Sequence, residues 1–166
     1  MGNRLPLLIF AALYGALGCT STPPEAPASG AASTIPPAPL ATLDGASTDL
    51  PDYLHGRTAL VSFWATWCDA CVKEMGALNR VSSEARSRPD ALVVGVAVGD
   101  TREAVRAFAA NHPFAYAQLV DEHFALADAL GERNVPATLV VDRHGHVVFR
   151  GGALDRDGLA AFRDAL

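Results

Sequence analysis

The sequence has few cysteines, and this scarcity excludes one class of small secreted protein. Three cysteines occur among 166 residues, too few for the disulfide scaffold that holds many short extracellular domains together. Half of the residues are apolar, which is enough to form a hydrophobic core in a chain of this length. The composition therefore predicts one globular domain that is stabilised by burial of apolar side chains.

The sequence also lacks an excess of basic charge. Its formal net charge is -5, so there is no electrostatic basis for nucleic-acid binding. Internal repeats are absent. A structural zinc site is not expected either, because neither Cys19 nor any pair of histidines supplies the two further ligands at a suitable spacing. No metal and no other cofactor is predicted.

The N-terminus has the pattern of an export signal. Arg4 supplies one positive charge, and the apolar run from Leu5 to Leu17 follows it. This run is shorter than the roughly 20 residues that cross a bilayer comfortably, but its size fits the core of a signal peptide. We therefore predict that residues 1–18 are a signal peptide.

Cys19 follows this apolar run directly. The segment Ala16-Leu17-Gly18-Cys19 resembles a bacterial lipobox, in which the cysteine is lipidated and becomes the mature N-terminus. It departs from the usual pattern at Ala16, where lipoboxes generally carry leucine. An uncleaved membrane anchor and ordinary signal cleavage are the alternatives. N-myristoylation is excluded because Pro6 stands where serine or threonine is required.

Residues 19–38 are rich in proline, alanine, serine and threonine. Such a composition cannot bury a core, and it predicts an extended, disordered tether. In polyproline conformation, the tether would reach on the order of 60 Å. A passive spacer of no set length is equally compatible. The globular domain is predicted to span residues 39–166.

The most informative motif is the pair Cys68 and Cys71. An apolar run at Ala59–Phe63 predicts a buried strand before it, and the residues from Val72 to Asn79 predict a helix after it. Residues three apart at the start of a helix share one face and are close enough for a disulfide. The helix N-terminus favours a thiolate on the first cysteine. The pair is predicted to be redox-active, with a purely structural disulfide as the alternative.

Strands and helices alternate along the rest of the domain. Further strands are expected at 40–45, 92–98, 116–120, 137–141 and 147–150, with helices after Cys71, after Asp100, between Asp121 and Gly131, and after Asp155. Alternation of this kind, followed by a closing hairpin and helix, predicts an α/β fold.

The segment Phe63-Trp64-Ala65-Thr66-Trp67-Cys68-x-x-Cys71, with Glu74 three residues later, resembles the TlpA/ResA-like branch of the thioredoxin family. Members of this branch are extracytoplasmic thiol-disulfide oxidoreductases, and the resemblance extends from about Pro39 to the C-terminus. It implies a thioredoxin fold: a central mixed sheet flanked by helices, with an N-terminal β extension.

The two cysteines are expected to have different roles. Cys68 opens the helix and is predicted to be the exposed nucleophile that forms a mixed disulfide with the substrate. Cys71, one turn deeper, would then resolve it. Asp69 adds negative charge beside the sulfurs and should make the site less oxidising, unless it merely caps the helix and points to water.

The resemblance also assigns residues around the pair. Pro136 is expected to follow a cis peptide bond and to lie against the cysteines, with the backbone of Val135 free to pair with an extended substrate strand. Trp67 should form part of the substrate surface, and Trp64 should pack in the core or at its rim. Glu74 corresponds to a buried or half-buried proton carrier for Cys71, with a solvated helix carboxylate as the alternative.

The function implied is that of a membrane-tethered oxidoreductase in the bacterial cell envelope, facing the periplasm or the cell exterior. It would reduce disulfides of exported proteins, possible substrates being apocytochrome c thiols, with a membrane thiol transporter as the electron donor. An oxidant or isomerase is the first alternative. A copper metallochaperone is the second, although such proteins usually space the cysteines Cys-x-x-x-Cys. A peroxidase is disfavoured because no Thr-x-x-Cys motif is present.

Overall fold

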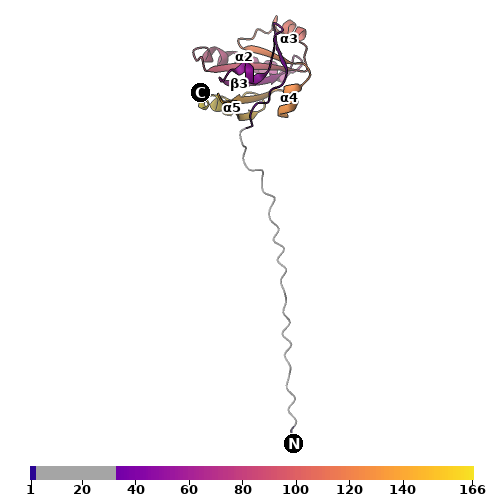
Figure 1. The fold of residues 1–166 in the computed structure, drawn as a ribbon, viewed down its shortest axis with the longest axis vertical. Coiled ribbons are helices and arrows are strands. Elements are labelled where there is room, and N and C mark those ends of the chain that lie inside the picture. The colour runs from indigo at the N-terminus through magenta and orange to yellow at the C-terminus, as the bar shows by residue number, and fades with distance from the viewer. Residues whose placement is uncertain (3–32) are drawn as a thin grey trace. The chain divides into compact units, whose positions relative to one another are not determined.

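The computed structural model describes residues 1–2 and 33–166. Its strands are β1 (Leu40–Thr42), β2 (Ser47–Thr48), β3 (Thr58–Trp64), β4 (Ala91–Val98), β5 (Ala117–Asp121), β6 (Ala137–Val141) and β7 (Val147–Gly151). Its helices are α1 (Leu50–Leu54), α2 (Asp69–Ala85), α3 (Arg102–Ala109), α4 (Ala125–Leu130) and α5 (Arg156–Asp164) (Figure 1).

The predicted signal peptide, Cys19 and most of the predicted tether lie outside the described residues. Within the described part of the chain, no helix is long and apolar enough to cross a membrane. The last residues assigned to the tether differ from that prediction. The amide of Ile35 donates to the carbonyl of Gly145 at 2.9 Å, and the Ile35 side chain is buried in the core. The packed chain therefore begins at about residue 33, because a single isoleucine in the proline-rich segment is enough to attach it to the β6–β7 hairpin.

The strands form one sheet of seven in the order β2-β1-β5-β4-β3-β6-β7. β3, β4 and β5 run parallel to one another, whereas β6, β7 and the β1–β2 extension pair antiparallel. Parallel strands require crossover helices, and α2 and α3 supply them here. This mixed sheet confirms the predicted thioredoxin fold with its N-terminal β extension.

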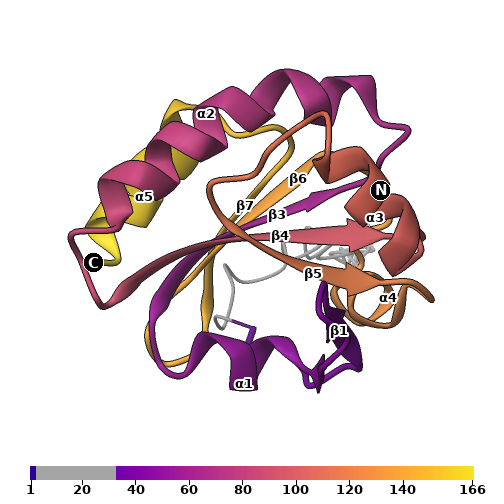
Figure 2. The same cartoon turned by 90° about the horizontal axis from the view of Figure 1, so that it is seen from above.

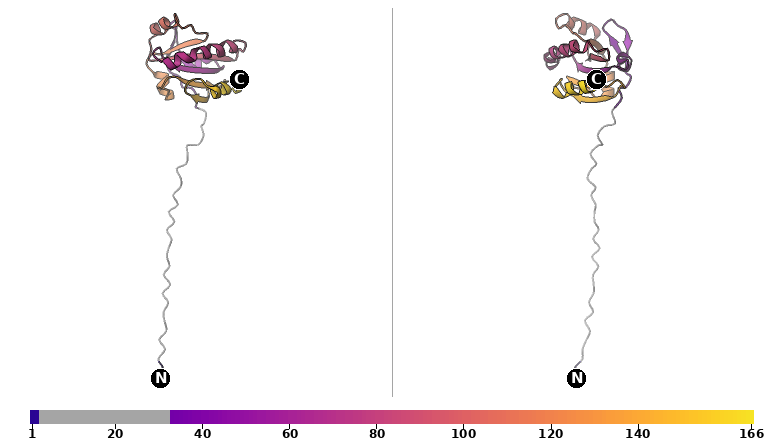
Figure 3. Two further views of the ribbon diagram at one scale, coloured as in Figure 1. Left: turned by 180° about the vertical axis from the view of Figure 1, so that it is seen from behind. Right: turned by 90° about the vertical axis from the view of Figure 1, so that its left-hand side faces the viewer.

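Helices cover both faces of the sheet. Figure 2 shows α2 and α5 side by side on one side and α1 on the other, and the right-hand view of Figure 3 shows the violet β1–β2 hairpin opposite α2 and α5. Side chains alternate between these faces along β3. Val61 and Phe63 belong to the core cluster that includes residues of α1 and α4, whereas Leu60 belongs to the cluster beneath α2 and α5.

Helix capping follows the sequence closely. Thr101 and Asp155 cap α3 and α5 by accepting hydrogen bonds from Ala104 and Gly158. Asp121 acts differently from a normal N-cap, because it is the last residue of β5. Its Oδ2 nevertheless accepts from the amides of Leu126 and Ala127 at 3.0 and 2.9 Å, so it still stabilises the start of α4.

Candidate active site

The cysteine pair lies where β3 gives way to α2. Cys68 is the N-cap of α2, with an extended backbone, and its Sγ accepts a hydrogen bond from the amide of Cys71 at 3.1 Å. The two cysteines form a disulfide whose Cα atoms are 5.3 Å apart. The helix N-terminus and an amide donor therefore both face Cys68 Sγ, which is the environment that stabilises a thiolate after reduction.

The pair is less open than the sequence predicted. In the disulfide, Cys68 is 6% exposed and Cys71 is 1% exposed. The predicted order of accessibility holds, but Cys68 is not a fully exposed residue. Trp67 is 67% exposed and lies immediately before Cys68, as expected of a residue on the substrate surface.

A buried carboxylate holds the loop before Cys68. Asp100, which is 7% exposed, accepts from the amide of Thr66 at 2.7 Å and from the Thr66 hydroxyl at 2.8 Å. From the sequence, Asp100 was only the residue after which a helix was expected. Its position two residues beyond the end of a buried parallel strand nevertheless indicates its location, because the carboxyl ends of neighbouring parallel strands meet at the same edge of the sheet.

Glu74 is buried beneath α2 and is 9% exposed, so the alternative of a solvated carboxylate is excluded. Its Oε2 accepts from the amide of Leu154 at 2.8 Å, and its Oε1 accepts from the Ser62 hydroxyl at 3.3 Å. Burial raises the pKa of Glu74 above its usual value, while these two hydrogen bonds act in the opposite direction. The net change in this pKa is upward, so burial outweighs the two hydrogen bonds at this carboxylate.

Val135 and Pro136 come from the loop before β6. Their peptide bond is cis, as predicted, and both residues are half-buried. Val135 packs against the core cluster that contains Cys68 and Cys71. The structure therefore brings together the cysteine pair and the Val135–Pro136 segment, which are more than sixty residues apart in the sequence.

Trp64 is a core residue, 2% exposed, whose ring packs against Phe108 and Phe114 at centroid distances of 5.3 and 5.2 Å. Its indole Nε1 donates to Gln118 Oε1 at 2.9 Å. Gln118 was not recognised from the sequence as part of the site. It lies on β5, two strands away from β3, and nothing in its local pattern indicates that its side chain turns toward Trp64.

No group of three or more His, Cys, Asp or Glu side chains that could hold a metal ion is present among the residues the structure describes.

Comparison with known proteins yields one family and several relatives. Residues 31–150 match the AhpC/TSA family. The thiol-disulfide oxidoreductase ResA of Geobacillus thermodenitrificans is 29% identical over 115 residues, which are 69% of this chain and 65% of that protein. ResA of Geobacillus kaustophilus is 28% identical over 141 residues, covering 85% of this chain and 80% of that protein. The chain thus spans less than two thirds of the first of these relatives.

The solved structure of MTB DsbF in its mixed oxidised and reduced forms is also similar. It is 30% identical to this chain, covers 77% of this chain and 94% of its own, and superposes with a TM-score of 0.64.

Proposed function

The chain belongs to the AhpC/TSA family and has a ResA-like thioredoxin fold, and from this premise we propose that it is a thiol-disulfide oxidoreductase that acts through Cys68 and Cys71. The observation that carries the proposal is the disulfide at the N-terminus of α2, with a buried carboxylate one helical turn beyond it. A structural disulfide would have no need of this carboxylate, whose burial is costly.

The reaction proceeds in two exchanges. In the reduced protein, the Cys68 thiolate attacks a substrate disulfide, and one substrate sulfur leaves as a thiolate. Cys71 then loses its proton and attacks Cys68 Sγ, so that the bond between Cys68 and the second substrate sulfur breaks. Two electrons pass from the protein to the substrate, which becomes a dithiol, and the protein keeps the Cys68–Cys71 disulfide.

Glu74 serves as the proton acceptor for Cys71. The thiol of Cys71 is almost fully buried, and ionising it there without a nearby base is unfavourable. Glu74 follows Cys71 by three residues on α2, so the two side chains lie on one face of the helix. Ser62, the other polar neighbour, is a poor base.

The substrate would lie across the surface formed by Trp67 and the Val135–Pro136 segment. Trp67 supplies an exposed aromatic face beside Cys68, and Val135 supplies a backbone that can pair with an extended chain.

In its cellular setting, we place the protein in the bacterial cell envelope, lipid-anchored through Cys19. It would act as a reductase of disulfides in exported proteins, including apocytochrome c, with electrons from a membrane thiol transporter. The N-terminal sequence pattern and the ResA-like relatives support this assignment. A Cys19→Ala variant should leave the membrane fraction or remain unprocessed, and normal processing with unchanged membrane attachment would contradict the lipid anchor.

The activity is tested by trapping. Cys71→Ala should accumulate mixed disulfides between Cys68 and exported proteins, because the resolving sulfur is absent. Non-reducing electrophoresis followed by mass mapping identifies the linked cysteine and its partners. The Cys68→Ala/Cys71→Ala double variant is the matched control and should trap nothing. The proposal fails if Cys71→Ala yields no adduct, or if adducts form through another cysteine.

A further inference from the structure

A row of polar residues crosses the sheet directly beneath α2. Gln118 of β5 lies opposite Gly95 of β4, and Ser62 of β3 lies opposite both Gly95 and Thr138 of β6. Residues paired in this way point to the same face of a sheet. We call Gln118, Ser62 and Thr138 the polar row. Apolar residues bound it on both sides along the strands, with Leu60, Val93 and Val140 before it and Trp64, Ala97 and Val120 after it.

Two members of the polar row have buried groups without a hydrogen-bond partner among the described residues. These are Gln118 Nε2 and Thr138 Oγ1, on side chains that are 6% and 0% exposed. The Gln118 amide lies over Gly95, since a Cβ added at Gly95 would overlap it. The amide is therefore held between β5 and Ser62. Buried polar groups without a protein partner are commonly bonded to internal water.

Glu74 lies at the middle of the polar row. Its Oε1 accepts a hydrogen bond from the hydroxyl of Ser62, the central residue of the row. The two groups without a partner, Gln118 Nε2 and Thr138 Oγ1, therefore lie on opposite sides of the Glu74–Ser62 pair. An internal water needs two to four polar partners. The Glu74 carboxylate and the Ser62 hydroxyl supply acceptors close to the Gln118 donor on one side and the Thr138 hydroxyl on the other.

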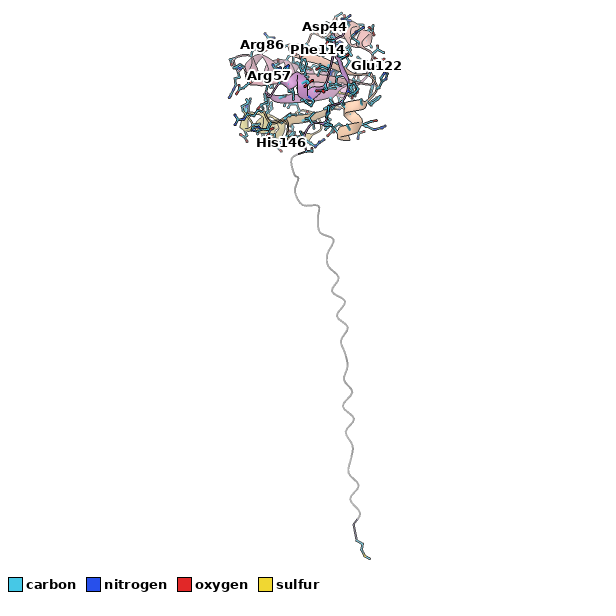
Figure 4. The ribbon with its side chains drawn as sticks, in the orientation of Figure 1. Asp44, Arg57, Arg86, Phe114, Glu122 and His146 are labelled. Carbon is cyan, nitrogen blue, oxygen red and sulfur yellow. A yellow bond between two sulfur atoms is a disulfide. The ribbon has the colours of Figure 1, made fainter. Side chains whose placement is uncertain are left out.

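The Gln118 end of the row reaches a cleft. Gln118 and its neighbour Tyr116 line an open cleft of about 710 Å³, together with Asp44 and Phe114 (labelled in Figure 4). The cleft lies along the part of β5 that β1 does not cover, because β1 pairs only with Leu119 and Val120. The cleft therefore lies at the Gln118 end of the polar row, and Trp67 is not among the residues that line it.

We propose that the polar row binds internal water and forms the route by which Glu74 exchanges its proton with solvent in the cleft beside Tyr116. This inference rests on the proposed role of Glu74. During turnover Glu74 takes the thiol proton of Cys71 while the bound substrate covers the mouth of the site. The proton then passes to the water bonded to Ser62 and Gln118 and leaves at the cleft, which returns Glu74 to its carboxylate form. No redox change accompanies this transfer.

The ionisable neighbours of Glu74 are few. On its own helix Cys71 lies one turn before it. On β5 Tyr116 lies at the edge of the row. Burial and the negative charge of Glu74 raise the pKa of its hydroxyl, while the neighbouring Gln118 side chain acts in the opposite direction. In the loop before α5, Asp155 follows Leu154, but its carboxylate caps α5. β3 and β6 present only the hydroxyls of Ser62 and Thr138. Cys71 and Glu74 are therefore the two groups between which the proposed proton transfer takes place.

The water is tested first. Oxygen-17 magnetic relaxation dispersion on the oxidised full chain should detect long-lived internal water that is lost in Thr138→Val and in Gln118→Met. Thr138→Ser keeps a hydroxyl and should retain the water. Thr58→Val is the matched control, since it removes another buried threonine hydroxyl from β3, one that bonds to the carbonyl of Ala165 at 3.1 Å. Equal internal hydration in all variants would overturn the proposal.

The route is tested by kinetics. Reduced protein mixed with 5,5′-dithiobis(2-nitrobenzoate) releases one thionitrobenzoate when Cys68 attacks and a second when Cys71 resolves the mixed disulfide. Gln118→Met should slow the second phase about three- to tenfold at a pH where Glu74 starts protonated. It should approach the parent rate at higher pH, where Glu74 has no proton to release. Thr138 lies on the side of Glu74 away from the cleft, so Thr138→Val should match the parent. Thr58→Val and Thr138→Ser should follow the parent throughout.

The outcomes separate the two proposals. If Glu74→Gln leaves the second phase unchanged, the role of Glu74 itself is wrong. If Glu74→Gln slows that phase while Gln118→Met matches the parent at every pH, Glu74 keeps its role and the route through Gln118 to the cleft is wrong. A uniform slowing of Gln118→Met at all pH values would also contradict the route, because it indicates a displaced Cys71 rather than blocked proton exchange.

Discussion

The two faces of the sheet are built from the same strands but differ in chemistry. The face covered by α1 and α4 is a continuous apolar core, in which Phe63, Val96 and Leu139 are fully buried. The face covered by α2 is interrupted by the disulfide, by Glu74 and by the polar row. One face stabilises the domain and the other holds reactive groups, and the alternation of side chains along each strand keeps the two apart.

This division has an energetic basis. An unsatisfied buried polar group costs about 1–3 kcal/mol, and burying a carboxylate adds to that. Burial on the α2 face therefore contributes less to the free energy of folding than the buried area alone would suggest. The large aliphatic residues of the α1/α4 face offset the difference, since complete burial of each one contributes about 1.5–3 kcal/mol.

The largest expected effect is on the apolar face. Leu139→Ala should lower the free energy of unfolding by about 2–5 kcal/mol, because it leaves a cavity among fully buried neighbours. Urea denaturation of the oxidised protein measures the loss. The rates of both phases of the thionitrobenzoate reaction should stay within about twofold of the parent under conditions where the variant is folded. A large change in either rate would show that the two faces of the sheet are coupled, and that the apolar face does not act on stability alone.

Glu74→Gln should change the free energy of unfolding less than Leu139→Ala does, but it should clearly slow the thiol-disulfide reaction. Resolution by Cys71 should slow about tenfold or more, as for loss of a general base. The exposed Glu84 lies on the same helix, so Glu84→Gln is the matched control and should react like the parent. Equal rates for both variants would assign proton removal to water instead.

The stability of Glu74→Gln should depend on pH in a defined direction. Burial raises the pKa of Glu74 in the folded protein above its ordinary value of 4.5, so the folded state holds this proton more tightly than the unfolded chain. The resulting stabilisation is complete below the unfolded pKa and is lost as pH rises through the folded pKa. Relative to the parent, Glu74→Gln should therefore become more stable as pH rises over that interval. A trend in the opposite direction in urea titrations would mean that hydrogen bonds to the carboxylate outweigh its burial.

Sequence patterns predicted most of the fold because its signals are local. The apolar run ending at Phe63, the capping residues Thr101 and Asp155, and the glycine that ends α4 each specify an element through short-range geometry. The cysteine pair was found for the same reason, since its spacing and its place before a helix are both visible in one short segment. The predicted start of the domain, residue 39, is later than the start of the packed chain at about residue 33. Little in the sequence indicates this, because Ile35 is a single apolar residue among prolines.

The remaining parts of the site depend on contacts that no local pattern contains. The Asp100–Thr66 bonds join residues 34 apart, and the Trp64–Gln118 bond joins residues 54 apart. The polar row exists only because strand register aligns three residues from different parts of the chain. The burial of Glu74 also depends on tertiary packing. From sequence alone, a carboxylate on a helix could equally be buried or exposed to solvent.

The smallest expected effect concerns Asp69, which contrasts with Glu74 on the same helix. Asp69 is exposed and occupies the first position of α2, next to Cys68. Its negative charge opposes a thiolate there, so Asp69→Asn should stabilise the reduced form and raise the reduction potential. A surface charge near a helix terminus contributes about 0.3–1 kcal/mol, which corresponds to on the order of 10–20 mV for a two-electron couple. Equilibration against glutathione measures the change, which should shrink at about 1 M salt because the interaction is screened. Asp157→Asn removes an acidic residue from the first turn of α5 and should leave the potential unchanged. An unchanged potential in Asp69→Asn would mean that this charge is fully solvated, and that only buried groups on the α2 face tune the cysteines.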